Sequence, residues 1–232
     1  MLSAIAIVPS APLLVPELAG AAAAEVADLT AAVLESAALL PARWVVVGTD
    51  VADGDLGPDP IGTFAGFGVD VRVGFSPRAV NRSTAEPGAL PLCALVAGWV
   101  RGQVRPETTA QVRVYAHDHA AGVALAHGRQ LRAEIDGLPD PIGVLVVADG
   151  ANTLTPSAPG GYDPGNVDAQ LALDDALANG DASALAGLPE TILGRVAFQV
   201  LAGLTEPGPR SAKELYRGAP YGVGYFAGAW QP

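Results

Sequence analysis

The hydrophobic pattern consists mainly of short, continuously apolar runs separated by polar or Pro/Gly-rich segments. The run at 4–8 ends at Pro9, and the runs at 44–47 and 143–148 are followed by glycine and aspartate. Apolar runs of this length without alternation are typical of strands buried on both faces of a parallel sheet. Residues 69–73 alternate instead, which predicts a half-exposed strand. Further strands are predicted at 111–115 and 222–230.

Between these strands, the apolar residues recur with helical spacing. The segment 21–40 is rich in Ala, Glu and Leu, and places Val26, Leu29, Val33 and Leu34 on one helical face. Strands that alternate with helices are typical of an α/β fold with a mainly parallel sheet. Further helices are predicted at 90–101, 119–135, 167–179, 181–187 and 189–203.

Length and composition favour one domain over 1–232. Half of the 232 residues are hydrophobic and only 16% are charged, which is enough for a large core and little of the polarity that marks disorder. The segment 51–66 is rich in Gly, Pro and Asp, and we expect it to cross the edge of the sheet as a loop.

Charge and cysteine content restrict the classes of binding partner and the cellular compartment that we expect. A formal charge of −11, from 13 basic and 24 acidic residues, argues against binding to nucleic acid or to anionic membranes. The single cysteine, Cys93, cannot form an internal disulfide, which favours a cytoplasmic setting. The apolar start of the chain lacks a basic region and is broken by prolines, so we expect neither a signal peptide nor a membrane span.

Three loops directly follow predicted buried strands. They read PSAPLL at 9–14, GTD at 48–50 and DGANTLT at 149–155. Loops at the carboxyl ends of parallel strands are where α/β folds place their binding sites. These loops are therefore the first candidates for a functional site.

In order, spacing and flanking residues, the loops resemble three signatures of the class III extradiol ring-cleavage dioxygenases, the LigB-like superfamily that includes the Memo proteins. The family patterns are roughly Pro-His-Pro-Pro-Leu-Leu, Ser-Pro-His and Gly-Asp-x-Ser-His-x-Leu. The resemblance extends to Asp118-His119, to 158–164 and to 218–225, and so covers nearly the whole chain. It implies a three-layer αβα sandwich with a mixed, mainly parallel central sheet. It also implies Fe(II) held by two histidines and a carboxylate, with another histidine as acid-base.

The chain departs from the family at these histidines. Ser10 and Asp50 align with the first two histidine positions, and Asn152 aligns with the acid-base position. A serine hydroxyl is a poor Fe(II) ligand, and an amide has no proton to exchange near neutral pH. We therefore expect a pseudoenzyme without a metal cofactor. Its pocket, which binds a small polar or aromatic molecule, is formed by Ser10, Asp50, His119, Asp149 and Asn152; a noncatalytic subunit is the other form of this hypothesis.

Two alternatives are active enzymes. One holds a cation with Asp50, Asp149 and His119, and the other is an Fe(II) dioxygenase. His119 is equally compatible with a pocket role and with a helix cap, and solvated loop acids explain the carboxylates as well. His117 and His119 are spaced to share one face of a strand as a metal pair. His127 is expected on the surface of a helix. As partners, the sequence leaves open a small ligand and a second copy of the chain in a homo-oligomer.

Overall fold

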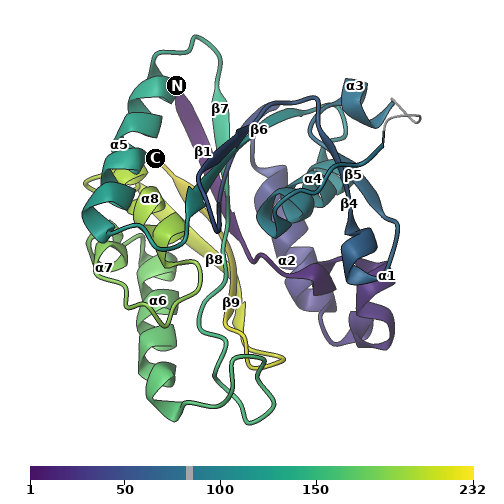
Figure 1. Ribbon diagram of the computed structural model, residues 1–232. Helices are drawn as coiled ribbons and strands as arrows, with labels where there is room; N and C mark the ends of the chain where they lie inside the picture. Colours follow the sequence, from purple (N-terminus) through teal and green to yellow (C-terminus); the bar gives the residue numbers. More distant parts are fainter. Residues whose placement is uncertain (82–85) are drawn as a thin grey trace.

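A computed structural model describes residues 1–81 and 86–232. It confirms the three-layer α/β sandwich: a seven-stranded sheet in the order β3-β6-β2-β7-β1-β9-β8, with helices on both faces (Figure 1). The strands are β1 (Leu2–Val8), β2 (Arg43–Asp50), β3 (Gly54–Leu56), β4 (Ile61–Thr63), β5 (Arg72–Gly74), β6 (Thr109–Ala116), β7 (Ile142–Val147), β8 (Ser211–Gly218) and β9 (Tyr225–Gln231). The longer helices are α2 (Ala27–Ala38), α4 (Leu92–Val104), α5 (Ala121–Asp136), α6 (Val167–Asn179) and α8 (Arg195–Thr205). The short ones are α1 (Pro16–Ala19), α3 (Pro77–Val80) and α7 (Ala182–Ala186), with 3-10 turns at η1 (Pro12–Leu14), η2 (Gly20–Ala24), η3 (Phe64–Phe67) and η4 (Pro164–Asn166).

The three apolar runs form adjacent central strands, as the sequence predicts. β7 lies between β2 and β1 and pairs parallel to both. Along β1, Ala4, Ala6 and Val8 face one core, and Ile5 and Ile7 face the other. Both sets are almost completely buried, which explains why the run is continuously apolar.

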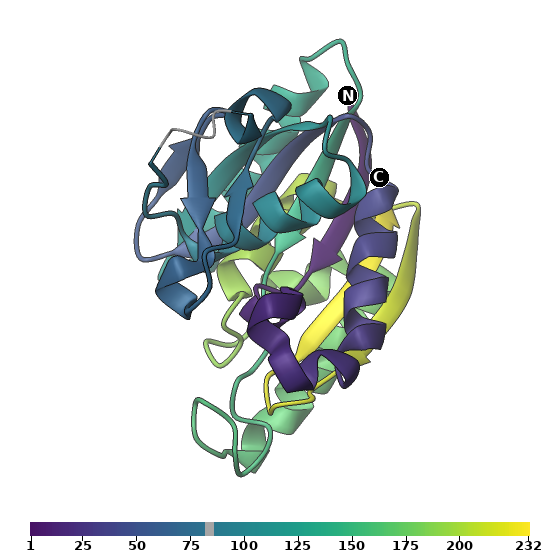
Figure 2. The same ribbon diagram turned by 90° about the vertical axis from the view of Figure 1, so that its right-hand side faces the viewer.

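The helices form two layers. Figures 1 and 2 show α2 and α4 on one face of the sheet, and α5, α6, α7 and α8 on the other. Trp44 and Leu40 belong to the core beneath α2 and α4, while Phe198 and Trp230 belong to the core beneath α6 and α8. Within residues 1–81 and 86–232, no helix is both long enough and apolar enough to cross a bilayer.

Two predicted helices begin later than the periodicity indicates. The helix expected from residue 21 begins at Ala27, because a 3-10 turn follows Gly20, whose φ is +53°. The helix expected from residue 189 begins at Arg195, because the main-chain N–H of Gly194 donates to the carbonyl oxygen of Asp149 instead. Residues 189–194 are therefore a connection between helices, anchored to the loop after β7.

The predicted strands need three corrections. β2 continues to Asp50, since Thr49 and Asp50 pair with the last residues of β6, so GTD is not a loop. The segment 51–66 contains β3, which pairs antiparallel with β6. β5 covers only the end of the expected strand, and pairs with β4 in a separate two-stranded sheet.

The sequence pattern gave no signal for β8. Its side chains are all exposed or half-buried, as on a strand at the edge of the sheet, and it has no apolar run. It pairs antiparallel with β9, which in turn pairs antiparallel with β1. The antiparallel strands at both sides make the sheet mixed.

Candidate functional site

The parallel strands β1, β7, β2 and β6 end together, at what we call the carboxyl end of the sheet. The structure brings two predicted site residues into contact there. The main-chain N–H of Ser10, just after β1, donates to Oδ1 of Asp149, just after β7, at 2.8 Å. Both residues are half-buried. Strand pairing therefore positions the loops at 9–14 and 149–155 side by side.

Asp149 is a carboxyl in a desolvated setting. Burial raises its pKa to about 7, against the smaller opposing effect of the Ser10 amide. The nearby Tyr225 hydroxyl also has a raised pKa, mainly through burial and further through the charge of Asp149. A carboxyl with a pKa in this range changes protonation close to physiological pH.

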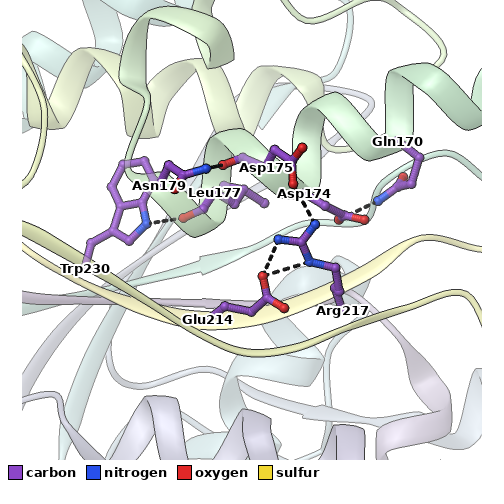
Figure 3. Close-up of polar contacts among 8 residues, drawn as sticks. All are labelled: Gln170, Asp174, Asp175, Leu177, Asn179, Glu214, Arg217 and Trp230. Atoms are coloured by element: carbon purple, nitrogen blue, oxygen red, sulfur yellow. Dashed lines mark hydrogen bonds and ion pairs between the residues drawn. The ribbon is translucent and has the colours of Figure 1, made fainter.

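A buried amide side chain holds the loop after β7. Oε1 of Gln170 on α6 accepts the main-chain N–H of Ala151 at 2.8 Å. Its Nε2 donates to Asp174 at 2.9 Å (Figure 3). A Cβ at Gly150 or at Gly224 would lie within about 2.1 Å of the Gln170 amide, so a side chain at either position would displace this amide. Burial raises the pKa of Asp174 to about 6.

The same helix is tied to the antiparallel side of the sheet (Figure 3). The Arg217 guanidinium on β8 donates to Asp175 at 2.8 Å, and the Trp230 indole on β9 donates to the carbonyl oxygen of Leu177 at 2.7 Å. Trp230 is fully buried, whereas the pair formed by Arg217 and Asp175 is exposed. α6 is thus a fixed support for the loop that it holds.

Asn152 and Asp50 make contacts of their own. The Asn152 side chain packs against Gly160, whose main-chain N–H donates to the Asn152 carbonyl oxygen at 3.0 Å. The carbonyl oxygen of Asp50 accepts the main-chain N–H of His117 at 2.9 Å and its ring Nδ1 at 3.0 Å. Burial raises the pKa of the Cys93 thiol to about 12, and the Asp50 charge adds to this effect.

The residues at the carboxyl end of the sheet do not fit the iron centre that the resemblance implies. At the aligned positions they offer a hydroxyl from Ser10, a carboxylate from Asp50 and an amide from Asn152. Imidazole nitrogen, which a two-histidine, one-carboxylate iron site requires, is missing from this set. The ligand atoms of Asp50, Asp149 and His119 also do not form a compact group of the kind that a metal needs.

A hollow of about 300 Å³ opens at the carboxyl end of the sheet, between the end of β6 and the start of α8. Arg195 supplies a cation to it, and its Nη2 donates to the carbonyl oxygen of His117 at 3.4 Å. The main-chain N–H of Leu193 donates to the carbonyl oxygen of Gly150, so the hollow is joined to the loop after β7. Its lining residues are His117, Asp118, Glu190, Ile192, Leu193 and Arg195.

His119 lies in a second group, with Asp53 and His127. Nε2 of His119 and Oδ1 of Asp53 are 2.7 Å apart. His127 was expected on the helix surface, but it is half-buried, and its ring centroid lies 5.1 Å from that of His119 and 5.0 Å from that of Tyr115. The Ala116 amide, and to a lesser degree His119, lowers the pKa of Asp53.

Sequence reasoning missed Asp53 and Arg195 as site residues. Asp53 lies in the Gly/Pro/Asp-rich segment, where nothing distinguishes it from solvated acids, and Arg195 lies within the expected helix at 189–203. The spacing of His117 and His119 suggested a metal pair, yet His117 binds the Asp50 carbonyl and His119 binds Asp53. Both contacts join segments more than sixty residues apart, so local spacing carries no signal for them.

No protein-family model matches the chain, and no curated protein matches it. Among solved structures, it is similar to the uncharacterized protein JW3007 from Escherichia coli K12, with a TM-score of 0.57 and 10% sequence identity. The similarity covers 98% of this chain and 99% of that one. At this identity the likeness shows a shared fold, and the chemistry of the site has to be argued from the residues of this chain.

Proposed function

We propose that this protein binds a small polar or aromatic molecule at the carboxyl end of its sheet and does not cleave aromatic rings. The Asp149 carboxyl carries the proposal. Because its pKa is about 7, it is present near neutral pH in both its protonated and its ionised form. Asp149 does not itself line the hollow beside Arg195, but its carbonyl oxygen accepts the main-chain N–H of Gly194 next to it. We propose that a ligand extends from the hollow to the Asp149 carboxyl, which can donate a hydrogen bond to a ligand oxygen or accept one from a ligand hydroxyl.

The hollow beside Arg195 supports a ligand of this class. Its volume of about 300 Å³ suits a single-ring compound, and Ile192 and Leu193 provide an apolar wall. The Arg195 guanidinium can face a ligand carboxylate, with which arginine forms strong, charge-assisted hydrogen bonds. Asp118 and Glu190 in the same lining can accept hydrogen bonds from ligand hydroxyls, so a hydroxylated aromatic acid with its carboxylate on Arg195 matches these groups.

The chemistry of the aligned positions supports binding without ring cleavage. Ser10 and Asn152 supply neither an imidazole ligand for Fe(II) nor a group that exchanges a proton near neutral pH. Within the LigB-like superfamily that its loops resemble, the protein would be a divergent member that has kept the pocket and lost the metal chemistry.

Calorimetric titration with protocatechuate at pH 7 tests the binding. We expect Asp149→Asn and Arg195→Ala each to weaken it by about tenfold, the typical effect of losing a hydrogen bond to a charged group. Arg210→Ala is the matched control. Arg210 pairs with Gln231 at the end of β9, away from the carboxyl end of the sheet, and its loss should change nothing. Absence of binding by the wild type, or unchanged binding by both site variants, would contradict the proposal.

Oxygen consumption tests the second part of the proposal, that the protein does not cleave aromatic rings. After incubation with Fe(II), the protein should consume no oxygen with catechol or protocatechuate, and no ring-opened product should form. A ring-opened product above the level of free Fe(II) would overturn the claim that the protein does not cleave aromatic rings.

A further inference from the structure

Apart from the residues around Asp149, the structure gathers a group of two imidazoles and one carboxylate: Asp53, His119 and His127. Asp53 lies between β2 and β3, His119 between β6 and α5, and His127 in α5. One ligand atom from each lies within 4.8 Å of the others. The fold therefore brings Asp53 next to two histidines that lie more than sixty residues further along the chain.

Contacts around the group orient its members. Oδ1 of Asp53 accepts the main-chain N–H of Ala116 at 2.7 Å, which fixes the carboxylate against the end of β6. The His127 ring packs against the Tyr115 ring. Supports of this kind hold metal ligands in place in known metal sites. Only 21% of the His119 side chain is exposed, whereas 53% of the Asp53 side chain is exposed, so the histidine side of the group is shielded and the carboxylate side is open to solvent.

The adjacent surface favours a cation. Asp53 and His127 also line a hollow of about 370 Å³ between β3, β6 and α5, which contains three carboxylates and one guanidinium. The carboxylates are those of Asp53, Asp55 and Glu134. The guanidinium, that of Arg113, is paired with Asp55 at 2.7 Å and with Glu134 at 3.3 Å. The negative charge of Asp53 therefore remains available to a metal ion.

We propose that Asp53, His119 and His127 bind a Zn²⁺ ion. Two imidazole nitrogens and one carboxylate oxygen form a common zinc ligand set, with the fourth position open to water or to a small ligand. This open position would face the hollow that Asp53 and His127 line. The site uses none of Ser10, Asp50 and Asn152, so it stands independently of ring-cleavage chemistry.

Titration calorimetry with Zn²⁺ on chelator-treated protein is the first test. We expect one ion per chain, and a loss of affinity of at least about tenfold in His119→Gln, His127→Gln and Asp53→Asn, since even supporting residues of metal sites contribute that much. His117→Gln is the matched control, because it is a histidine two residues away that binds Asp50 instead. Circular dichroism in the presence of chelator checks that each variant is folded.

A second measurement needs no variant. In the nitrogen NMR spectrum of the wild-type histidine rings, Zn²⁺ should shift the signals of His119 and His127 and leave those of His117 in place. Failure of the wild type to bind one ion per chain would overturn the proposal. Shifts of His117 and His119 without His127 would overturn it too, because they would assign the ion to the two neighbouring loop histidines.

Discussion

Asp149 links the protonation of a single residue to the stability of the fold. Burial raises its pKa from 3.8 to about 7, so between these values the folded state holds a proton that the unfolded state has released. Protonation of Asp149 therefore contributes fully to the free energy of unfolding below about pH 4. This contribution, at most about 4 kcal/mol, is lost as the pH rises to about 7. Asn retains an acceptor for the Ser10 amide and cannot ionise. We expect Asp149→Asn to become more stable than the wild type as the pH rises from 5 to 8.

Urea unfolding of both proteins at pH 5 and pH 8 measures this difference. Asp174, whose pKa is raised to about 6, titrates in both proteins and cancels from the comparison. Asp136→Asn is a control of opposite sign, because the Arg132 guanidinium lowers the pKa of Asp136. Its contribution is present in full at both pH 5 and pH 8 and is lost only below about pH 4, so the stability difference between this variant and the wild type should be the same at pH 5 and pH 8 and should shrink at pH 3. A constant difference between Asp149→Asn and wild type would contradict the assigned pKa.

At the scale of elements, α5 and α8 touch through glycines. A Cβ at Gly128 of α5 would lie 2.1 Å from the carbonyl oxygen of Val200, and one at Gly203 of α8 would lie 2.1 Å from that of Leu125. Backbone cannot move aside as a flexible side chain can, so the helices would have to separate. We expect Gly128→Ala to lower the free energy of unfolding by about 1–3 kcal/mol, the usual cost of overpacking.

Gly122→Ala is the matched control for this contact. Gly122 lies on the same helix and is exposed, and a Cβ there meets nothing within 4 Å. Removing its backbone freedom should stabilise the protein by about 0.4–1 kcal/mol. Thermal unfolding of the two variants should therefore give shifts of opposite sign. A neutral Gly128→Ala would show that α5 and α8 pack less closely than described.

The elements also show what a sequence pattern can reveal. β1, β2 and β7 were predictable because burial on both faces leaves a continuous apolar run. β8 was not, because a strand at the edge of the sheet is defined by its pairing partner and carries half-exposed polar side chains. The apolar runs also indicated that these strands are adjacent, although their order in the sheet was not predicted, and parallel pairing then joined Ser10 to Asp149. The pairing of His119 with Asp53 depends on β3 adding to β6, a contact that no local pattern encodes.

At the scale of the whole molecule, the parallel pairing of β1, β7 and β2 predicts that side chains at positions 10 and 50 can bind one metal ion together. It places residues 10 and 50 at one end of the sheet, with the Asp149 carboxyl in contact with the Ser10 amide. We expect Ser10→His combined with Asp50→His to create weak Fe(II) affinity there. The double variant is best built in a His127→Gln background, so that the Asp53–His119–His127 group does not bind the metal.

Measuring metal affinity and ring cleavage in this variant separates two claims: that positions 10 and 50 converge on one point, and that ring cleavage also needs an acid-base group at position 152. Fe(II) titration should show binding in the His127→Gln/Ser10→His/Asp50→His protein and less in His127→Gln alone, because only the former has imidazoles at positions 10 and 50, which follow β1 and end β2. Ring cleavage should still be absent, since Asn152 cannot transfer a proton. Adding Asn152→His supplies a general acid-base, which typically contributes about a hundredfold to ten-thousandfold, and it can help only if a carboxylate such as Asp149 completes the ligand set. If a folded variant gains no Fe(II) affinity, the side chains at positions 10 and 50 do not converge, and the resemblance of these loops to the dioxygenase signatures does not extend to a shared site.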